Sequence, residues 1–171
     1  MVQKKICMLG YFAVGKTSLV RRYVESIFSE EYITTIGVKI DKKTLSVSGK
    51  NVTLVVWDVY GEDSHQSVMP AYFRGMAGYL LVVDPTRPNT ITNAEILNSR
   101  VREVVGNLPF VLVKNKSDLK ESWITDDSDL EALEKSASSV IETSAKTDSN
   151  VDEMFESLAT VVMKDHKRHS G

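Results

Sequence analysis

The sequence predicts an α/β domain in which helices cover both faces of a mostly parallel β-sheet. Short apolar runs bounded by turn residues alternate with segments of helical period along the 171 residues. Two of these runs, residues 79–83 and 110–113, are continuously apolar, as strands of a parallel sheet are when both of their faces are buried. Because the length is that of one domain, residues 1–171 are expected to form a single unit.

The first half of the chain predicts a strand, a helix and a hairpin. Residues 4–9 form the first expected strand, and a glycine-containing loop leads into a helix that begins at Lys16. The apolar face of that helix consists of Leu19, Val20, Tyr23 and Val24. After a polar stretch, residues 38–47 and 52–58 flank a short turn, and they therefore predict two antiparallel strands. The first of these strands changes its apolar phase between Ile40 and Leu45, which indicates a bulge.

The second half of the chain repeats the order of strand and then helix. The helix after residues 79–83 ends before Gly106, and its apolar face consists of Leu97, Val101, Val104 and Val105. A weaker helix over residues 127–136 and a short strand at residues 140–141 are expected next. The apolar face of the last helix consists of Val151, Met154, Phe155, Leu158 and Val162.

Composition and charge exclude several classes of protein. The net charge of −2 provides no positive field, so we expect no nucleic-acid partner. The single cysteine, Cys7, excludes a disulfide scaffold and a cysteine-ligated zinc site. The sequence has no signal segment, no glycine at position 2 and no cysteine near its end. We therefore expect a monomeric cytoplasmic protein with no direct membrane anchor in this chain.

A phosphate-binding motif follows the first strand. Residues 10–17, GYFAVGKT, fit the pattern G-x-x-x-x-G-K-[S/T], and they lie between a predicted strand and a predicted helix, as the motif requires. Backbone N–H groups of such a loop converge on phosphate, and the start of the helix adds the positive end of its dipole. Lys16 is expected to reach the β and γ phosphates, and the Thr17 hydroxyl to ligate Mg²⁺.

A second motif selects the base. Residues 115–118, NKSD, follow the strand at 110–113, at the edge of the sheet where ligands of open α/β folds bind. The Asp118 carboxylate can accept hydrogen bonds from N1–H and the 2-amino group of guanine, whereas adenine has neither donor. Leaving a buried carboxylate unpaired costs about 1–3 kcal/mol or more. The motif therefore predicts guanine and disfavours a P-loop kinase.

Several motifs in fixed order resemble those of small GTPases of the Ras superfamily. They are residues 10–17, Thr35, residues 58–61, residues 115–118 and residues 142–146. Thr35 with its neighbours, Trp57-Asp58 and the segment 72–75 are most similar to the Rab branch. The resemblance implies a P-loop NTPase fold, with a six-stranded, mostly parallel sheet and five helices on both faces.

The same resemblance implies a role for each matching residue. The nucleotide, GTP or GDP, is expected to contact Ala13, Val14, Gly15, Lys16, Thr17, Ser18, Phe28, Thr35, Gly61, Asn115, Lys116, Asp118, Ser144, Ala145 and Lys146. The Mg²⁺ cofactor is expected at Thr17, Thr35 and Asp58, and catalysis at Lys16, Thr35 and Glu62. Thr35 would reach the ion only when γ-phosphate is present. Effectors and regulators are expected to bind switch I, residues 28–38, and switch II, residues 58–74.

Four residues around the γ-phosphate depart from the family pattern. Phe12 and Ala13 replace small or glycine residues, Tyr60 replaces the usual alanine, and Glu62 replaces the water-orienting glutamine. Two functions are consistent with these departures. One is a GTP/GDP-dependent switch that hydrolyses GTP slowly, and the other is a GTP-loaded binding module with little or no hydrolytic activity.

Overall fold

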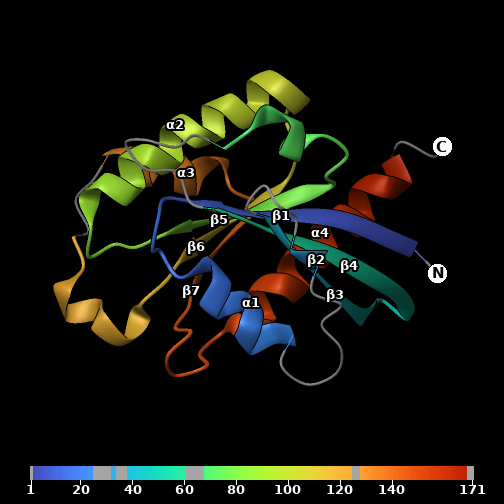
Figure 1. Cartoon of the computed structure of the whole chain (residues 1–171), viewed down its shortest axis with the longest axis horizontal. Coiled ribbons are helices and arrows are strands. Elements are labelled where there is room, and N and C mark those ends of the chain that lie inside the picture. Colours follow the sequence, from blue (N-terminus) through green and yellow to red (C-terminus); the bar gives the residue numbers. More distant parts are fainter. Residues whose placement is uncertain (1, 25–31, 34–37, 61–67, 125–127, 169–171) are drawn as a thin grey trace.

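One β-sheet separates two layers of helices in the part of the chain that the computed structural model describes, residues 2–24, 32–33, 38–60, 68–124 and 128–168 (Figure 1). The strands are β1 (Val2–Gly10), β2 (Tyr32–Ile33), β3 (Val38–Val47), β4 (Lys50–Val59), β5 (Gly78–Val83), β6 (Phe110–Lys114) and β7 (Ser139–Glu142). The α-helices are α1 (Lys16–Val24), α2 (Pro88–Val105), α3 (Ser128–Ser136) and α4 (Val151–Arg168). Two 3₁₀ helices, η1 (Pro70–Phe73) and η2 (Ser117–Ser122), complete these elements.

The sheet confirms the predicted α/β architecture. Its strand order is β2-β3-β4-β1-β5-β6-β7, with β1 at the centre. The pairs β1–β4, β1–β5, β5–β6 and β6–β7 are parallel, and β2–β3 and β3–β4 are antiparallel. The six predicted strands are present, and β2 adds a short edge strand. The described residues contain four α-helices and two 3₁₀ helices where five helices were expected.

The predicted bulge in β3 is wrong. The β3–β4 register runs without interruption from the pair Val38–Val59 to the pair Val47–Lys50. The change of phase has another cause, because the two ends of the strand are covered on opposite faces of the sheet. Val38 and Ile40 pack on one side, whereas Leu45 and Val47 pack on the other.

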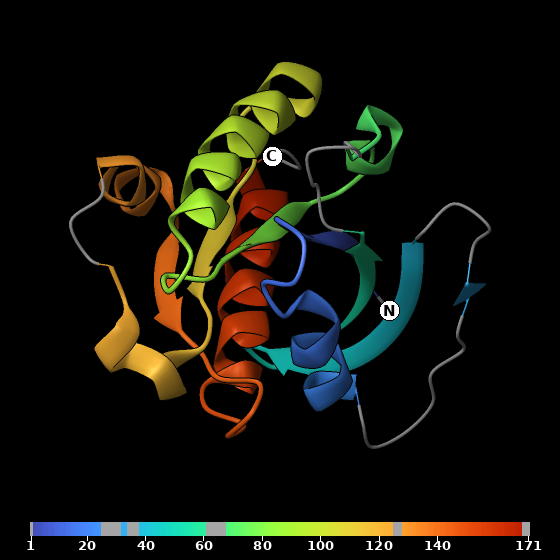
Figure 2. The same cartoon turned by 60° about the vertical axis from the view of Figure 1, so that its left-hand side comes forward.

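Each face of the sheet has its own hydrophobic core. Figure 1 shows α1 and α4 on one face and α2 and α3 on the other, and Figure 2 shows α4 along the sheet with α1 beside it. Side chains of β5 and β6 alternate between the two cores. Leu80 and Val111 lie in the core under α1 and α4, whereas Leu81 and Leu112 lie in the core under α2 and α3. This alternation explains the continuously apolar runs of the sequence, because both faces of these strands are buried.

The cysteine of the central strand is inaccessible. Cys7 is fully buried, and its Sγ lies 3.5 Å from the carbonyl oxygen of Tyr72. Burial raises the pKa of the thiol to about 12, against a smaller lowering by Lys5.

Parallel strands bring the loops with the sequence motifs to one edge of the sheet. The loops that follow β1, β5, β6 and β7 all leave from the carboxyl ends of their strands, and the end of β4 lies beside them. In the described residues, no helix is long and apolar enough to cross a membrane.

Candidate nucleotide-binding site

The loop after β1 turns a series of backbone N–H groups to one side. The carbonyl oxygens of Phe12 and Ala13 accept hydrogen bonds from Arg87, and that of Val14 accepts one from the Asn115 amide at 2.9 Å. No described peptide bond is cis. In a trans peptide, the N–H that follows a carbonyl points the opposite way. The N–H groups of residues 13–15 therefore point away from those donors, toward the concave side of the loop, where an anion can bind.

The loop requires backbone conformations that favour glycine. Gly15 has φ +103°, and a Cβ added there would lie 2.3 Å from the Asn115 amide nitrogen. Ala13 has φ +60° although it carries a side chain. Such a left-handed conformation costs about 1–2 kcal/mol for a residue other than glycine. The carbonyl oxygens of the peptides on both sides of Ala13 accept hydrogen bonds from Arg87.

Lys16 places a buried ammonium group inside the loop. Its Nζ donates to the carbonyl oxygens of Gly10 and Tyr11, at 3.2 and 3.1 Å. Burial lowers the pKa of Lys16 to about 8, although Asp58 acts to raise it. Those carbonyls take two of the three N–H donors of an ammonium group, so one remains for a phosphate oxygen. A bound phosphate would also favour the charged form.

Thr17 and Asp58 form an oxygen pair that suits Mg²⁺. The Thr17 hydroxyl donates to the Asp58 carboxylate at 2.7 Å, which leaves hydroxyl lone pairs for a cation. Burial raises the pKa of Asp58, while the Thr17 hydrogen bond and Lys16 oppose that shift. Elsewhere in the described ranges, no three His, Cys, Asp or Glu side chains form a metal cluster. Protein sites for Mg²⁺ often combine one or two such ligands with substrate phosphates, so the pair fits the predicted ion.

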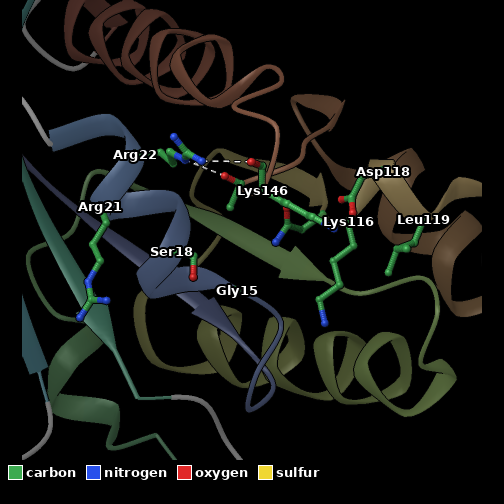
Figure 3. A pocket seen from close by; sticks show the side chains of 10 residues that line it. Gly15, Ser18, Arg21, Arg22, Lys116, Asp118, Leu119 and Lys146 are labelled. Carbon is green, nitrogen blue, oxygen red and sulfur yellow. Dashed lines mark hydrogen bonds between the residues drawn. The ribbon is translucent and has the colours of Figure 1, made fainter.

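A cavity of about 560 Å³ extends from this loop toward the second motif. Figure 3 shows Gly15 and Ser18, at the start of α1, on one side of it, and Lys116 and Asp118 on the other. The residues around it are Gly15, Ser18, Arg21, Arg22, Asn115, Lys116, Asp118, Leu119, Ala145 and Lys146. Seven of these ten residues were predicted nucleotide contacts, and the sequence did not indicate Arg21, Arg22 or Leu119.

 Ser144, another predicted contact, does not line the cavity but reaches Asp118 through a hydrogen bond.

A serine in the loop after β7 orients the predicted base-binding carboxylate of Asp118, which follows β6. Ser144 is buried, and its hydroxyl donates to the Asp118 carboxylate at 2.8 Å. The Thr147 N–H donates to the same hydroxyl oxygen at 3.1 Å, which fixes its orientation. Carboxylate oxygens have about four acceptor positions in all, so Asp118 keeps enough of them for two donors of a base.

Asn115 joins three loops of the site. Its amide nitrogen binds the Val14 carbonyl, its amide oxygen accepts from the Thr143 hydroxyl at 3.0 Å, and its backbone N–H donates to Val83 at 3.0 Å. The side chain is almost fully buried. Asn115 therefore fixes the position of the phosphate loop relative to the base-binding loops and need not touch the base itself.

Sequence reasoning missed three charged residues of the site. Arg22 donates from α1 to the carbonyl oxygens of Ala145 and Lys146, at 2.7 and 3.0 Å, and Figure 3 shows both bonds. Asp84 is fully buried after β5, where Lys116 binds it at 2.7 Å, and Arg87 contacts the phosphate loop. None of these residues belongs to a pattern of spacing, so the sequence carried no signal for them.

Four predicted residues lie outside the described residues: Phe28, Thr35, Gly61 and Glu62. Of the four departures from the family pattern, Phe12, Ala13 and Tyr60 are among the described residues. Phe12 and Tyr60 are 57% and 64% exposed, so neither side chain is part of the core.

Comparison with known proteins identifies relatives over almost the whole chain. Residues 5–164 match the Ras family. The Ras-related protein SEC4 of Saccharomyces cerevisiae is 39% identical over 162 residues, which are 94% of this chain and 75% of that protein. The Ras-related protein Rab-13 of Canis lupus familiaris is 33% identical over 170 residues, which are 98% of this chain and 84% of that protein. The chain therefore belongs to the Ras family and is a Rab-like small GTPase of the Ras superfamily.

Proposed function

We propose that this chain binds GDP and GTP together with Mg²⁺ and acts as a guanine-nucleotide switch that hydrolyses GTP slowly. The observation that carries the proposal is a continuous cavity that joins Gly15 and Ser18 to Asp118. The loop that the cavity meets at Gly15 offers N–H groups and the buried ammonium of Lys16 to phosphates, and the other end of the cavity offers a carboxylate to a base. A ligand that has phosphates at one end and guanine at the other matches both.

The residues of the site divide the work of binding. Lys16 and the N–H groups of residues 13–15 hold the phosphates, and Asp118 accepts the two guanine donors. Thr17 and Asp58 would hold the ion. When bound, Mg²⁺ neutralises charge on the β and γ phosphates.

Slow hydrolysis is proposed from the side chains around the phosphate loop. Phe12 and Tyr60 are large and exposed, and they stand where the family pattern has small residues. An arginine supplied by an activating protein contributes a rate factor of about 10³–10⁵, provided that it can enter the site. Phe12 would obstruct that entry, and Tyr60 would hinder closure of switch II over the γ-phosphate.

The second candidate is a GTP-loaded binding module with little or no hydrolytic activity. The same two exposed aromatic side chains favour it, because a site that excludes the activating arginine keeps its triphosphate. In either case effectors and regulators would bind switch I, residues 28–38, and switch II, residues 58–74.

Three measurements test these proposals. Nucleotide released from the purified protein is identified by chromatography, and ATP is compared with GTP as a competitor of bound GDP. Effective competition by ATP would contradict the guanine assignment. Single-turnover hydrolysis of bound GTP then separates the candidates, since only the first converts the triphosphate to GDP.

A further inference from the structure

An arginine outside the nucleotide motifs lies against the phosphate loop. The Nη1 of Arg87 donates to the carbonyl oxygens of Phe12 and Ala13, at 3.1 and 3.2 Å. Its guanidinium also lies 5.7 Å from the ring centroid of Tyr11, which precedes these residues. A residue of the loop after β5 thus contacts three consecutive residues of the phosphate loop.

The backbone of Arg87 is fixed, and the helix that follows does not depend on its side chain. The Arg87 N–H donates to the Asp84 carbonyl at 2.9 Å, and its carbonyl accepts from the Thr90 N–H and hydroxyl at 3.0 and 2.8 Å. Although Arg87 is the N-cap of α2, its side chain makes no capping hydrogen bond. The guanidinium is therefore available to the phosphate loop.

The buried carboxylate of Asp84 lies close to both cations that contact the phosphate loop, Arg87 and Lys116. Asp84 is fully buried, and its carboxylate lies 2.7 Å from the Lys116 ammonium and 3.9 Å from Arg87. Burial alone would raise the pKa of Asp84, but hydrogen bonds from Lys116 and Thr86 outweigh it and leave the pKa below its usual value. The negative charge holds both cations on the same side of the loop, where Lys116 also approaches the Ala13 carbonyl at 3.4 Å.

We infer that Arg87 is a positioning residue that bridges the Phe12 and Ala13 carbonyls and thereby slows the release of bound nucleotide. The inference rests on the proposed function. Because the peptide bonds are trans, a guanidinium that holds these carbonyls outward also keeps the N–H groups of Ala13 and Val14 turned toward the phosphates. Without it, the left-handed Ala13 has less to hold it in place, and the loop loses part of its anion-binding shape.

The test compares Arg87→Gln, Arg87→Lys and the control Arg102→Gln, each in full-length protein loaded with fluorescent GDP or GTP. Arg102 is an exposed arginine of α2, so its replacement by glutamine removes the same charge far along the same helix. Arg87→Gln should release both nucleotides about tenfold faster, which corresponds to about 1.4 kcal/mol. Arg87→Lys should fall between Arg87→Gln and the unmodified protein, because an ammonium lacks the planar fork of a guanidinium. Arg102→Gln should match the unmodified protein.

A phosphorus NMR spectrum of bound GDP supplies a readout that a general loss of stability would not move. Arg87→Gln should shift the β-phosphate resonance, and Arg102→Gln should leave it in place. Release within twofold of the unmodified rate, with an unchanged resonance, would overturn the inference, as would full rescue by lysine. If the unmodified protein binds no guanine nucleotide, the proposed function fails first and the inference with it.

Discussion

The two ends of the nucleotide cavity hold their backbone in similar ways but tolerate different side chains. At the phosphate end, Arg87 binds two carbonyl oxygens, and at the base end Arg22 does the same. Yet the phosphate end carries Phe12 and Ala13 in unusual places, whereas the base end keeps both of its family motifs. In the proposed function, backbone N–H groups of residues 13–15 bind phosphate, so the side chains of Phe12 and Ala13 can vary although those of Lys16 and Thr17 cannot. At the second end the proposed contact to the base is made by the side chain of Asp118, so that residue cannot vary.

The largest effect is expected from a substitution that removes the charge at the base end of the cavity. Asp118→Asn should weaken GDP and GTP about a hundredfold or more, because a charged acceptor for two donors is lost. The amide should instead favour xanthine nucleotides, whose 2-oxo group accepts a hydrogen bond from it. Competition binding with GDP and xanthosine diphosphate measures the exchange of preference. An unchanged preference for guanine would remove Asp118 from the base site.

A second variant disturbs the contact between Gly15 of the phosphate loop and Asn115, which connects the two ends of the cavity. Gly15→Ala should weaken GDP about tenfold or more, because its Cβ would lie 2.3 Å from the Asn115 amide and the residue has φ +103°. The matched control is Gly49→Ala, which also has positive φ, at +75°, but has no other atom within 4 Å of its added Cβ. Titration with fluorescent GDP compares the two variants. Equal losses would mean that backbone strain alone accounts for the effect.

The steric departures at the phosphate end can be tested by removing them. Phe12→Gly, Tyr60→Ala and the double variant should hydrolyse GTP progressively faster, and the double variant should be fastest. A water misplaced by about 1 Å can cost about a hundredfold in rate, which sets the scale of the possible gain. Single-turnover assays with and without an arginine-supplying activator give the rates. An unmodified protein that is already as fast as the double variant would refute the steric explanation.

The smallest expected effect concerns the arginine of the base end. Arg22→Gln should accelerate GDP release about threefold, because its two bonds to the Ala145 and Lys146 carbonyls are exposed and each contributes little. Stopped-flow release, with Arg102→Gln as the control for lost charge, measures it. A larger effect than that of Arg87→Gln would reverse the order proposed for the two ends.

Sequence reasoning predicted what local patterns determine. The phosphate loop was found because residues 10–17 lie together between a strand and a helix, and residues 115–118 because they follow a buried strand. Arg87 and Arg22 were missed because their partners are 75 and 123 residues away in the chain, and only the strand order brings them together. The two-residue strand β2 was missed because two residues cannot display a period.

The buried thiol of Cys7 in the central strand can report how often the sheet opens around it. Cys7 is the single cysteine, and with a pKa of about 12 it has little thiolate at any ordinary pH. Because burial both shields the thiol and disfavours the thiolate, a thiol reagent should modify the closed protein very slowly. The rate of modification therefore measures how often the sheet opens at β1. Cys7 lies three residues before the phosphate loop begins at Gly10. A ligand that binds to that loop should make these openings rarer and so slow the modification of Cys7.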